Sequence, residues 1–155
     1  MAGGGNEPAT DTGLAQAHSR LRVPTRGRGL VELTRQVGDW VREIGASDGL
    51  LTLYVRHTSA SLTIQENADP DVGRDLLTAL DRLAPEDEAY RHSVEGPDDM
   101  PAHIKSMLTS TSLGVPVLGG APVLGTWQGI FLIEHRSAPH AREVVLHYIG
   151  TLARG

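Results

Sequence analysis

The spacing of apolar residues predicts two main helices and a short one. From 29 to 45 the apolar side chains recur at intervals of three and four, which is typical of a helix with one face against a core. Asp69 and Pro70 have the chemistry of an N-cap followed by proline at the first helical position, and apolar positions continue to Leu83. A short third helix is expected in 98–108, capped by Asp98 or Asp99.

Other apolar runs predict strands, because they are short, alternate with polar residues or are bounded by turn residues. About seven are expected, at 19–25, 50–56, 60–65, 112–118, 122–125, 129–136 and 142–150. We therefore predict an α+β fold, a single β-rich domain with a β-sandwich-like core, two main helices and one short helix.

Residues 1–19 are small and polar, with no apolar segment and no basic start, so we expect a flexible tail ahead of a single domain over 20–155. No apolar run approaches the roughly 18 residues that a membrane helix needs. We expect a cytoplasmic protein with no membrane partner. Since the chain has no cysteine, disulfides, thiolate nucleophiles and cysteine metal sites are excluded.

The net charge of −5 is unevenly distributed. Eleven acidic residues and three arginines lie between Glu66 and Asp99. An acidic chain without a basic face is a poor binder of nucleic acid, so no nucleic-acid partner is expected. The acidic block fits a solvated face, and a cation site is the alternative.

Four histidines, His57, His92, His103 and His135, lie at the ends of predicted elements or beside carboxylates. None of them pairs in the helical His-x3-His spacing of a metal motif, so each taken alone fits a structural role as well as a metal site. Carboxylates that could add ligands or orient the imidazoles are Glu66, Asp69, Glu95, Asp98 and Asp99.

Two further features suggest a ligand. Lys105 is the only lysine beside thirteen arginines, and it follows the start of the short helix, where backbone N–H groups favour a phosphate. In GTWQG, Trp127 fits either a packed turn or an aromatic wall for a planar ligand, with Gln128 as a polar contact. A surface role for Lys105 is the alternative.

Four blocks, HTSASLTIQENADPDV, YRHSVEGPDDMPAHIKS, TSLGVPV and LGTWQGIFLIEHR, resemble the YjbQ family over about residues 20–150. The resemblance implies a small β-rich homotrimer with a metal among clustered histidines at a pocket. It also implies a weak, secondary thiamine-phosphate synthase activity.

Carried over by residue, the resemblance makes His57, His92 and His103 the metal ligands. The metal would be divalent, with zinc expected first and magnesium or manganese as alternatives. The resemblance also implies a pocket for a small phosphorylated substrate, lined by Glu66, Asn67, Asp69, Lys105, Gln128, Glu134 and Arg142.

Three functions follow as expectations. In a thiamine-phosphate synthase, the metal and Lys105 would stabilise the departing pyrophosphate while Trp127 stacks on the pyrimidine. In a zinc hydrolase of a small ester, lactone or phosphate, Glu66 or Glu134 would act as the base for a metal-bound water. The third is a non-enzymatic trimer that binds a metal or a metabolite.

Overall fold

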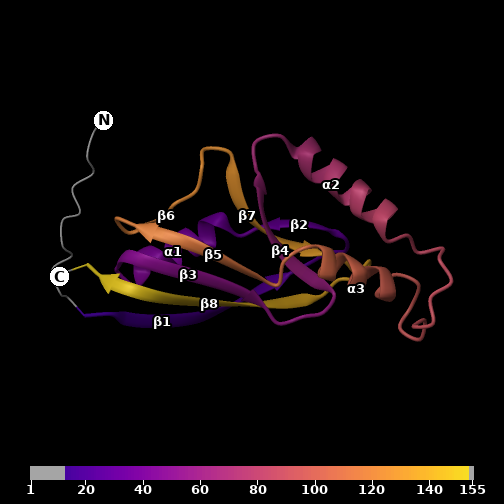
Figure 1. The fold of residues 1–155 in the computed structure, drawn as a ribbon, viewed down its shortest axis with the longest axis horizontal. Coiled ribbons are helices and arrows are strands. Elements are labelled where there is room, and N and C mark those ends of the chain that lie inside the picture. The colour runs from indigo at the N-terminus through magenta and orange to yellow at the C-terminus, as the bar shows by residue number, and fades with distance from the viewer. Residues whose placement is uncertain (1–12, 154–155) are drawn as a thin grey trace.

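The chain folds into two antiparallel sheets and three helices (Figure 1). The computed structural model describes residues 13–153. The five-stranded sheet has the order β1 (Ala15–Pro24), β8 (Ala141–Leu152), β3 (Ala46–Val55), β5 (Ser112–Leu118), β6 (Ala121–Pro122). The three-stranded sheet has the order β2 (Gly29–Glu32), β7 (Gln128–Glu134), β4 (Ala60–Glu66). The helices are α1 (Thr34–Glu43), α2 (Pro70–Leu83) and α3 (Asp99–Leu108), so the predicted α+β class is confirmed.

One hydrophobic core joins both sheets and α1. Strand β8 shows how it is built, because Val144, Leu146 and Tyr148 are buried while the residues between them are partly exposed. This alternation places one face of the strand inside and the other toward solvent. The remaining core side chains are aliphatic, apart from Trp40 of α1.

Among the predicted boundaries that differ from the structure, two have the same cause. Residues 15–19, assigned to the tail, belong to β1, which pairs along its whole length with β8. Residues 29–32, assigned to the first helix, form β2 and pair with 131–134 of β7. Both differences arise from pairing with strands about a hundred or more residues away along the chain, which local periodicity does not report. Residues 1–12 of the predicted tail lie outside the described residues.

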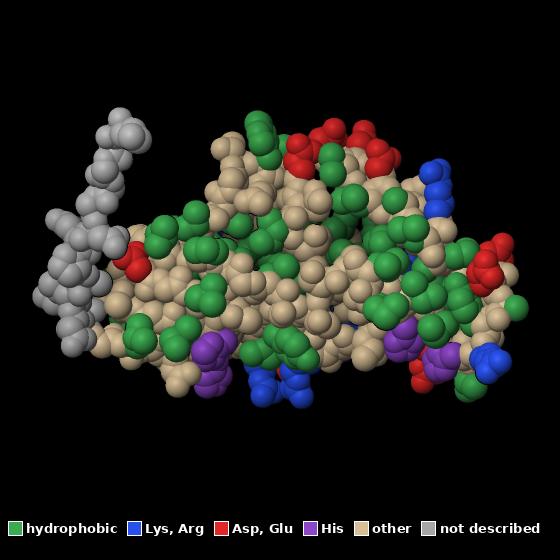
Figure 2. Space-filling view, in the orientation of Figure 1, with side chains coloured by type: hydrophobic (Ala, Val, Ile, Leu, Met, Phe, Trp, Pro, Cys, Tyr) green, Lys and Arg blue, Asp and Glu red, His purple; other side chains and the backbone are tan. Residues whose placement is uncertain are grey.

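Helix α2 begins where its cap predicts. The Oδ1 atom of Asp69 accepts a hydrogen bond from the backbone N–H of Asp71 at 2.9 Å, and Pro70 takes the first helical position. No side chain of α2 is fully buried. In Figure 2, acidic side chains gather along the edge where Figure 1 places α2.

Because little packing holds α2, its cap carries much of its local stability. We expect Asp69→Ala to lower the free energy of unfolding by about 1 kcal/mol, since it leaves the Asp71 N–H without its partner. Urea denaturation measures the change. Asp75→Ala, at an exposed position in the middle of α2, is the control and should change the free energy by less than about 0.5 kcal/mol. Equal effects of the two substitutions would contradict the capping role.

Among residues 13–153, no helix has the length and apolar character that crossing a membrane requires. The cytoplasmic location stays a prediction.

Candidate functional site

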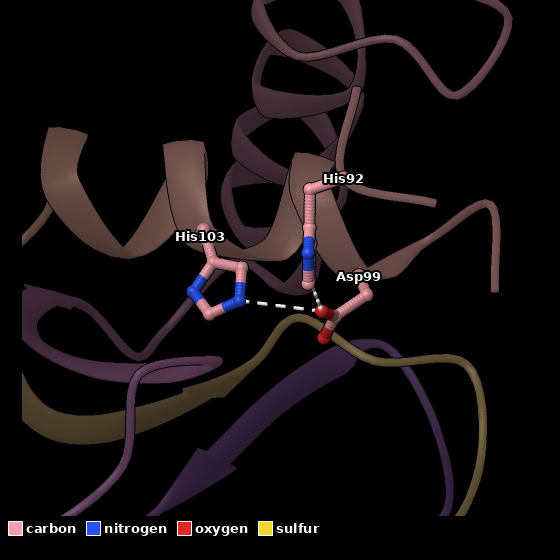
Figure 3. A group of neighbouring side chains, drawn as sticks. All are labelled: His92, Asp99 and His103. Carbon is pink, nitrogen blue, oxygen red and sulfur yellow. Dashed lines mark hydrogen bonds and ion pairs between the residues drawn. The ribbon is translucent and has the colours of Figure 1, made fainter. Parts of the chain in front are cut away.

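Two imidazoles and a carboxylate meet at the start of α3 (Figure 3). The Nε2 atom of His92 lies 2.6 Å from Oδ2 of Asp99, and Nε2 of His103 lies 3.2 Å from the same oxygen. The two rings approach edge to face, with centroids 5.5 Å apart. One carboxylate oxygen of Asp99 therefore lies between two histidines.

Helix α3 positions two of the three residues, Asp99 and His103. Asp99 and His103 are four residues apart in α3, and residues at this spacing lie on the same helical face. His92 comes from the segment between α2 and α3. The Asp99 side chain is only 3% exposed, whereas those of His92 and His103 are 45% and 34% exposed. The imidazoles are thus reachable from solvent while the carboxylate is fixed inside.

Arg136, just beyond β7, holds the carboxylates in place. Its Nη1 donates to Oδ1 of Asp99 at 2.7 Å, and its Nε donates to Oδ2 of Asp98 at 3.0 Å. Burial alone would raise the pKa of Asp99, but the hydrogen bond with His92 and the charge of Arg136 outweigh it and lower that pKa. Burial is likewise outweighed at Asp98, where the Ser137 N–H and Arg136 lower the pKa to about 2.

The cluster has the donor atoms of a divalent metal site. Its three potential ligand atoms lie within 4.8 Å of one another. Zinc–ligand distances of about 2.0–2.2 Å place tetrahedral ligand atoms about 3.3–3.6 Å apart. The 3.2 Å separation of His103 from Asp99 is close to this spacing, and the 2.6 Å separation of His92 from Asp99 would have to lengthen by less than about 1 Å. Arg136 on the second oxygen of Asp99 is the kind of outer contact that orients a ligating carboxylate.

His57, the third predicted ligand, is not part of this cluster. Its Nε2 accepts a hydrogen bond from the backbone N–H of Glu143 at 2.8 Å. An amide nitrogen can only donate, so Nε2 is unprotonated and already used, and the proton of the neutral ring is on Nδ1. In this arrangement neither ring nitrogen offers a lone pair to a metal. Burial, and then the charge of Arg142, lower the pKa of His57, which favours the neutral ring.

Asp99 stands where His57 was expected. The Asp-x3-His spacing of Asp99 and His103 was visible in a predicted helix and is the signal that would have selected Asp99 as a ligand. Arg136, which holds Asp98 and Asp99 in place, was not predicted, because it has no sequence spacing to them that indicates a contact.

Glu134 and Arg142 form a buried ion pair. Glu134 is fully buried and Arg142 is 4% exposed. Oε2 of Glu134 accepts from Nε of Arg142 at 2.7 Å and from the Thr25 hydroxyl at 2.7 Å, while Oε1 accepts from Nη2 of Arg142 and from the backbone N–H of Arg136 at 3.0 Å. Burial would raise the pKa of Glu134, but these hydrogen bonds lower it. A carboxylate so fully engaged is poorly suited to the predicted role of a base.

Other predicted pocket residues line a groove beside α2. Glu66, Asn67 and Asp69 contribute to its wall, and the groove has a volume of about 320 Å³. Gln128 pairs with Glu66 in the sheet, and its Oε1 accepts from the backbone N–H of Gly125 at 2.8 Å.

Two residues predicted to contact substrate are placed differently. The side chain of Lys105 is 3% exposed, and its Nζ lies 2.5 Å from Oδ1 of the half-exposed Asp81, so its ammonium group is already paired with a carboxylate. Trp127 is 63% exposed in the turn before β7. The predicted residues thus fall into separate places: the histidine cluster, the buried pair, the groove beside α2 and an exposed turn.

Comparison with known sequences gives one consistent family. The profile of the UPF0047 protein YjbQ-like family matches residues 19–151. A UPF0047 protein from Synechocystis is 53% identical over 131 residues, a match that covers 84% of this chain and 89% of the relative. The UPF0047 protein YjbQ of Escherichia coli O157:H7 is 45% identical over 127 residues, covering 81% of this chain and 90% of the relative.

Comparison with solved structures finds the same family and fold. An uncharacterised YjbQ/UPF0047 protein from Clostridium acetobutylicum is 38% identical with a TM-score of 0.74, covering 84% of this chain and 97% of that one. A conserved hypothetical protein from Thermus thermophilus is 39% identical with a TM-score of 0.73, covering 87% and 99%. A protein of unknown function from Sulfolobus solfataricus P2, at 24% identity and a TM-score of 0.83 over 90% and 100%, shows the same fold.

These findings correct the predicted function. The relatives are known by family names or as proteins of unknown function, and none carries a thiamine-phosphate synthase activity or a metal-dependent reaction in its description. The residues assigned to the synthase reaction also do not converge, because Lys105 is buried against Asp81 and Trp127 is exposed elsewhere. The thiamine-phosphate synthase prediction is therefore wrong. The structure describes a single chain, so the homotrimer stays a prediction.

Proposed function

The chain belongs to the UPF0047 YjbQ-like family, and we propose that it binds a divalent metal ion through His92, Asp99 and His103. The observation that carries the proposal is the single oxygen of Asp99 that lies between two Nε2 atoms. Without a metal, a proton must occupy each short contact, whereas a metal would replace those protons and bind all three atoms at once.

The donor set favours zinc over magnesium. Magnesium prefers oxygen ligands in an octahedral shell that keeps several waters, whereas imidazole nitrogen suits zinc and other transition metals. Two imidazoles and one carboxylate also match the composition of zinc sites that keep a position open. We rank zinc first, with manganese behind it.

Three protein ligands leave room for a fourth donor. In tetrahedral coordination this position would hold water or an oxygen atom of a small molecule. The partial exposure of both imidazoles supports access from solvent, while Asp99 and Arg136 fix the inner side of the site. A small molecule that supplies an oxygen donor is expected to bind the ion at this position.

Calorimetric titration of chelator-stripped protein with zinc tests the proposal. Wild type is expected to bind one ion per chain. His103→Ala and His92→Ala should each weaken binding by more than about 100-fold, because each removes one of three ligands, whereas loss of an outer contact to a ligand alone costs about ten- to 100-fold. Binding should also release protons, which titration in two buffers of different ionisation enthalpy detects.

His140→Ala is the matched control. His140 is partly exposed and lies outside the cluster, with its Nδ1 donating to the Ala138 carbonyl at 2.8 Å. This variant should bind zinc like wild type. Wild type that takes up no zinc, or equal losses in His103→Ala and His140→Ala, would remove the basis for the proposal.

A further inference from the structure

A second pocket lies where β3 leads into β4, opposite the start of β8. His57, Ser59 and Arg142 contribute to its wall, and its volume is about 560 Å³. A neighbouring pocket of about 330 Å³ shares Arg142 and adds Arg20 and Arg22 of β1. Neither pocket includes a residue of the His92, Asp99 and His103 cluster.

The wall of this pocket presents hydrogen-bond donors that have no acceptor. Arg142 uses Nε and Nη2 for Glu134 and Ser59, and within residues 13–153 its Nη1 donates to no acceptor. No polar side-chain atom in the described chain is both fully buried and unpartnered, so Nη1 reaches solvent although Arg142 is only 4% exposed. The Nη1 atom of this nearly buried guanidinium is therefore unpaired, and Arg142 contacts solvent at the two pockets that it lines.

His57 and Ser59 add two donors. Because the Glu143 N–H occupies Nε2 of His57, the ring proton is on Nδ1, and this N–H has no acceptor among the described residues. The Oγ atom of Ser59 accepts from Nη2 of Arg142 at 3.0 Å, so its hydroxyl hydrogen is free to donate. Three donors with no acceptor between them is the pattern that an anion satisfies.

The net charge around the two pockets is positive, which also favours an anion. Arg20, Arg22, Arg56 and Arg142 lie at the two pockets, against the carboxylates of Glu134 and Glu143. Four positive and two negative charges leave an excess of two positive charges on a chain whose net charge is −5. Figure 2 shows basic side chains on the lower edge, below β8, away from the acidic side chains at α2.

We propose that this pocket, with Arg142 Nη1, the Nδ1–H of His57 and the Ser59 hydroxyl as donors, binds the oxyanion group of a small molecule. The Glu134 carboxylate fixes the guanidinium from behind, so its free edge is oriented before the ligand arrives. A phosphate or a carboxylate group would offer the acceptors that these donors lack. The inference assigns His57 a donor role in place of the metal-ligand role predicted for it.

Titration with inorganic phosphate and, separately, with acetate tests the site and distinguishes the two sources of the oxyanion. A chelator is present throughout, and chloride holds the ionic strength constant. We expect saturable binding of at least one anion to wild type, followed by nuclear magnetic resonance of backbone amides. Ser59→Ala and His57→Gln should each weaken that binding by about tenfold, because each alters a donor to a charged ligand.

His103→Ala is the control that separates this site from the metal proposal, and it should bind the anion like wild type. Histidine side-chain ¹⁵N spectra should also show His57 as the Nδ1–H tautomer. The inference is overturned if neither anion binds saturably, if Ser59→Ala and His57→Gln bind like wild type, or if His57 carries its proton on Nε2. Should His57→Gln fail to fold, the partly buried Ser59→Ala decides the outcome.

Discussion

Glu134→Ala is expected to lower the free energy of unfolding by about 3–5 kcal/mol, because it leaves the charge of Arg142 buried without its partner. Glu134 is fully buried and accepts hydrogen bonds from Arg142, Thr25 and the backbone of Arg136. Its removal therefore takes the acceptor from hydrogen-bond donors of three residues, and the buried Nε and Nη2 edge of the guanidinium loses its counter-charge. Chemical denaturation at pH 7.5 measures the loss.

The double variant Glu134→Leu with Arg142→Met separates pairing from packing. If the loss comes from an uncompensated charge, replacing both partners by apolar side chains should recover most of the stability. The exposed pair of Asp71 and Arg74 is a matched control, and Asp71→Ala should cost less than about 1 kcal/mol because solvent screens it. A loss below about 1 kcal/mol for Glu134→Ala would contradict the burial of the charged pair.

Local signals predicted those parts of the fold that depend on neighbouring residues. The cap at Asp69 and the proline after it set the start of α2, and the apolar run at 142–150 indicated the strand that β8 forms. The start of α1 was not predictable in this way. Leu30 keeps the helical spacing with Leu33, yet it belongs to a strand because β2 pairs with β7, about a hundred residues later.

In the candidate site, too, contacts between residues close in the sequence were predictable, and contacts with distant residues were not. His92 and His103 were among four candidate histidines and were assigned as ligands by the family resemblance, and the structure brings them together. Asp99 was predicted only as one of five carboxylates that could add a ligand or orient an imidazole, although its four-residue spacing from His103 in a predicted helix already indicated a shared face. The position of His57 could not be predicted from the sequence, because its Nε2 accepts a hydrogen bond from a backbone N–H that lies 86 residues away along the chain. Motif resemblance therefore grouped residues that the topology separates.

His135 is the second residue with a large expected effect, and here the effect depends on pH. Its ring is 2% exposed, and its Nε2 lies 2.8 Å from the hydroxyl oxygen of Ser61. Burial lowers its pKa to about 4, and the positive charges of Lys105 and Arg142 act in the same direction. In the unfolded chain the ring titrates near its ordinary pKa of 6.5.

Between these two pKa values the unfolded state binds more protons than the folded state, so stability rises with pH across this window. Stability from the neutral ring is fully present above about pH 6.5 and is lost as pH falls toward 4. The whole window corresponds to about 3 kcal/mol, of which about 2 kcal/mol is lost by pH 5. This range lies above the lowered pKa values of Asp98 and Asp99, which affect stability only at lower pH.

Urea denaturation of wild type and His135→Gln at pH 7.5 and 5.0, with a chelator present, measures the contribution. The stability difference between the two pH values should be about 2 kcal/mol smaller in His135→Gln, even though the variant is less stable at both. His147→Gln, on the partly exposed face of β8, should keep the wild-type difference. If His135→Gln keeps it as well, the proton taken up on unfolding belongs to another group, and the neutral buried ring of His135 is not what makes the fold sensitive to mild acid.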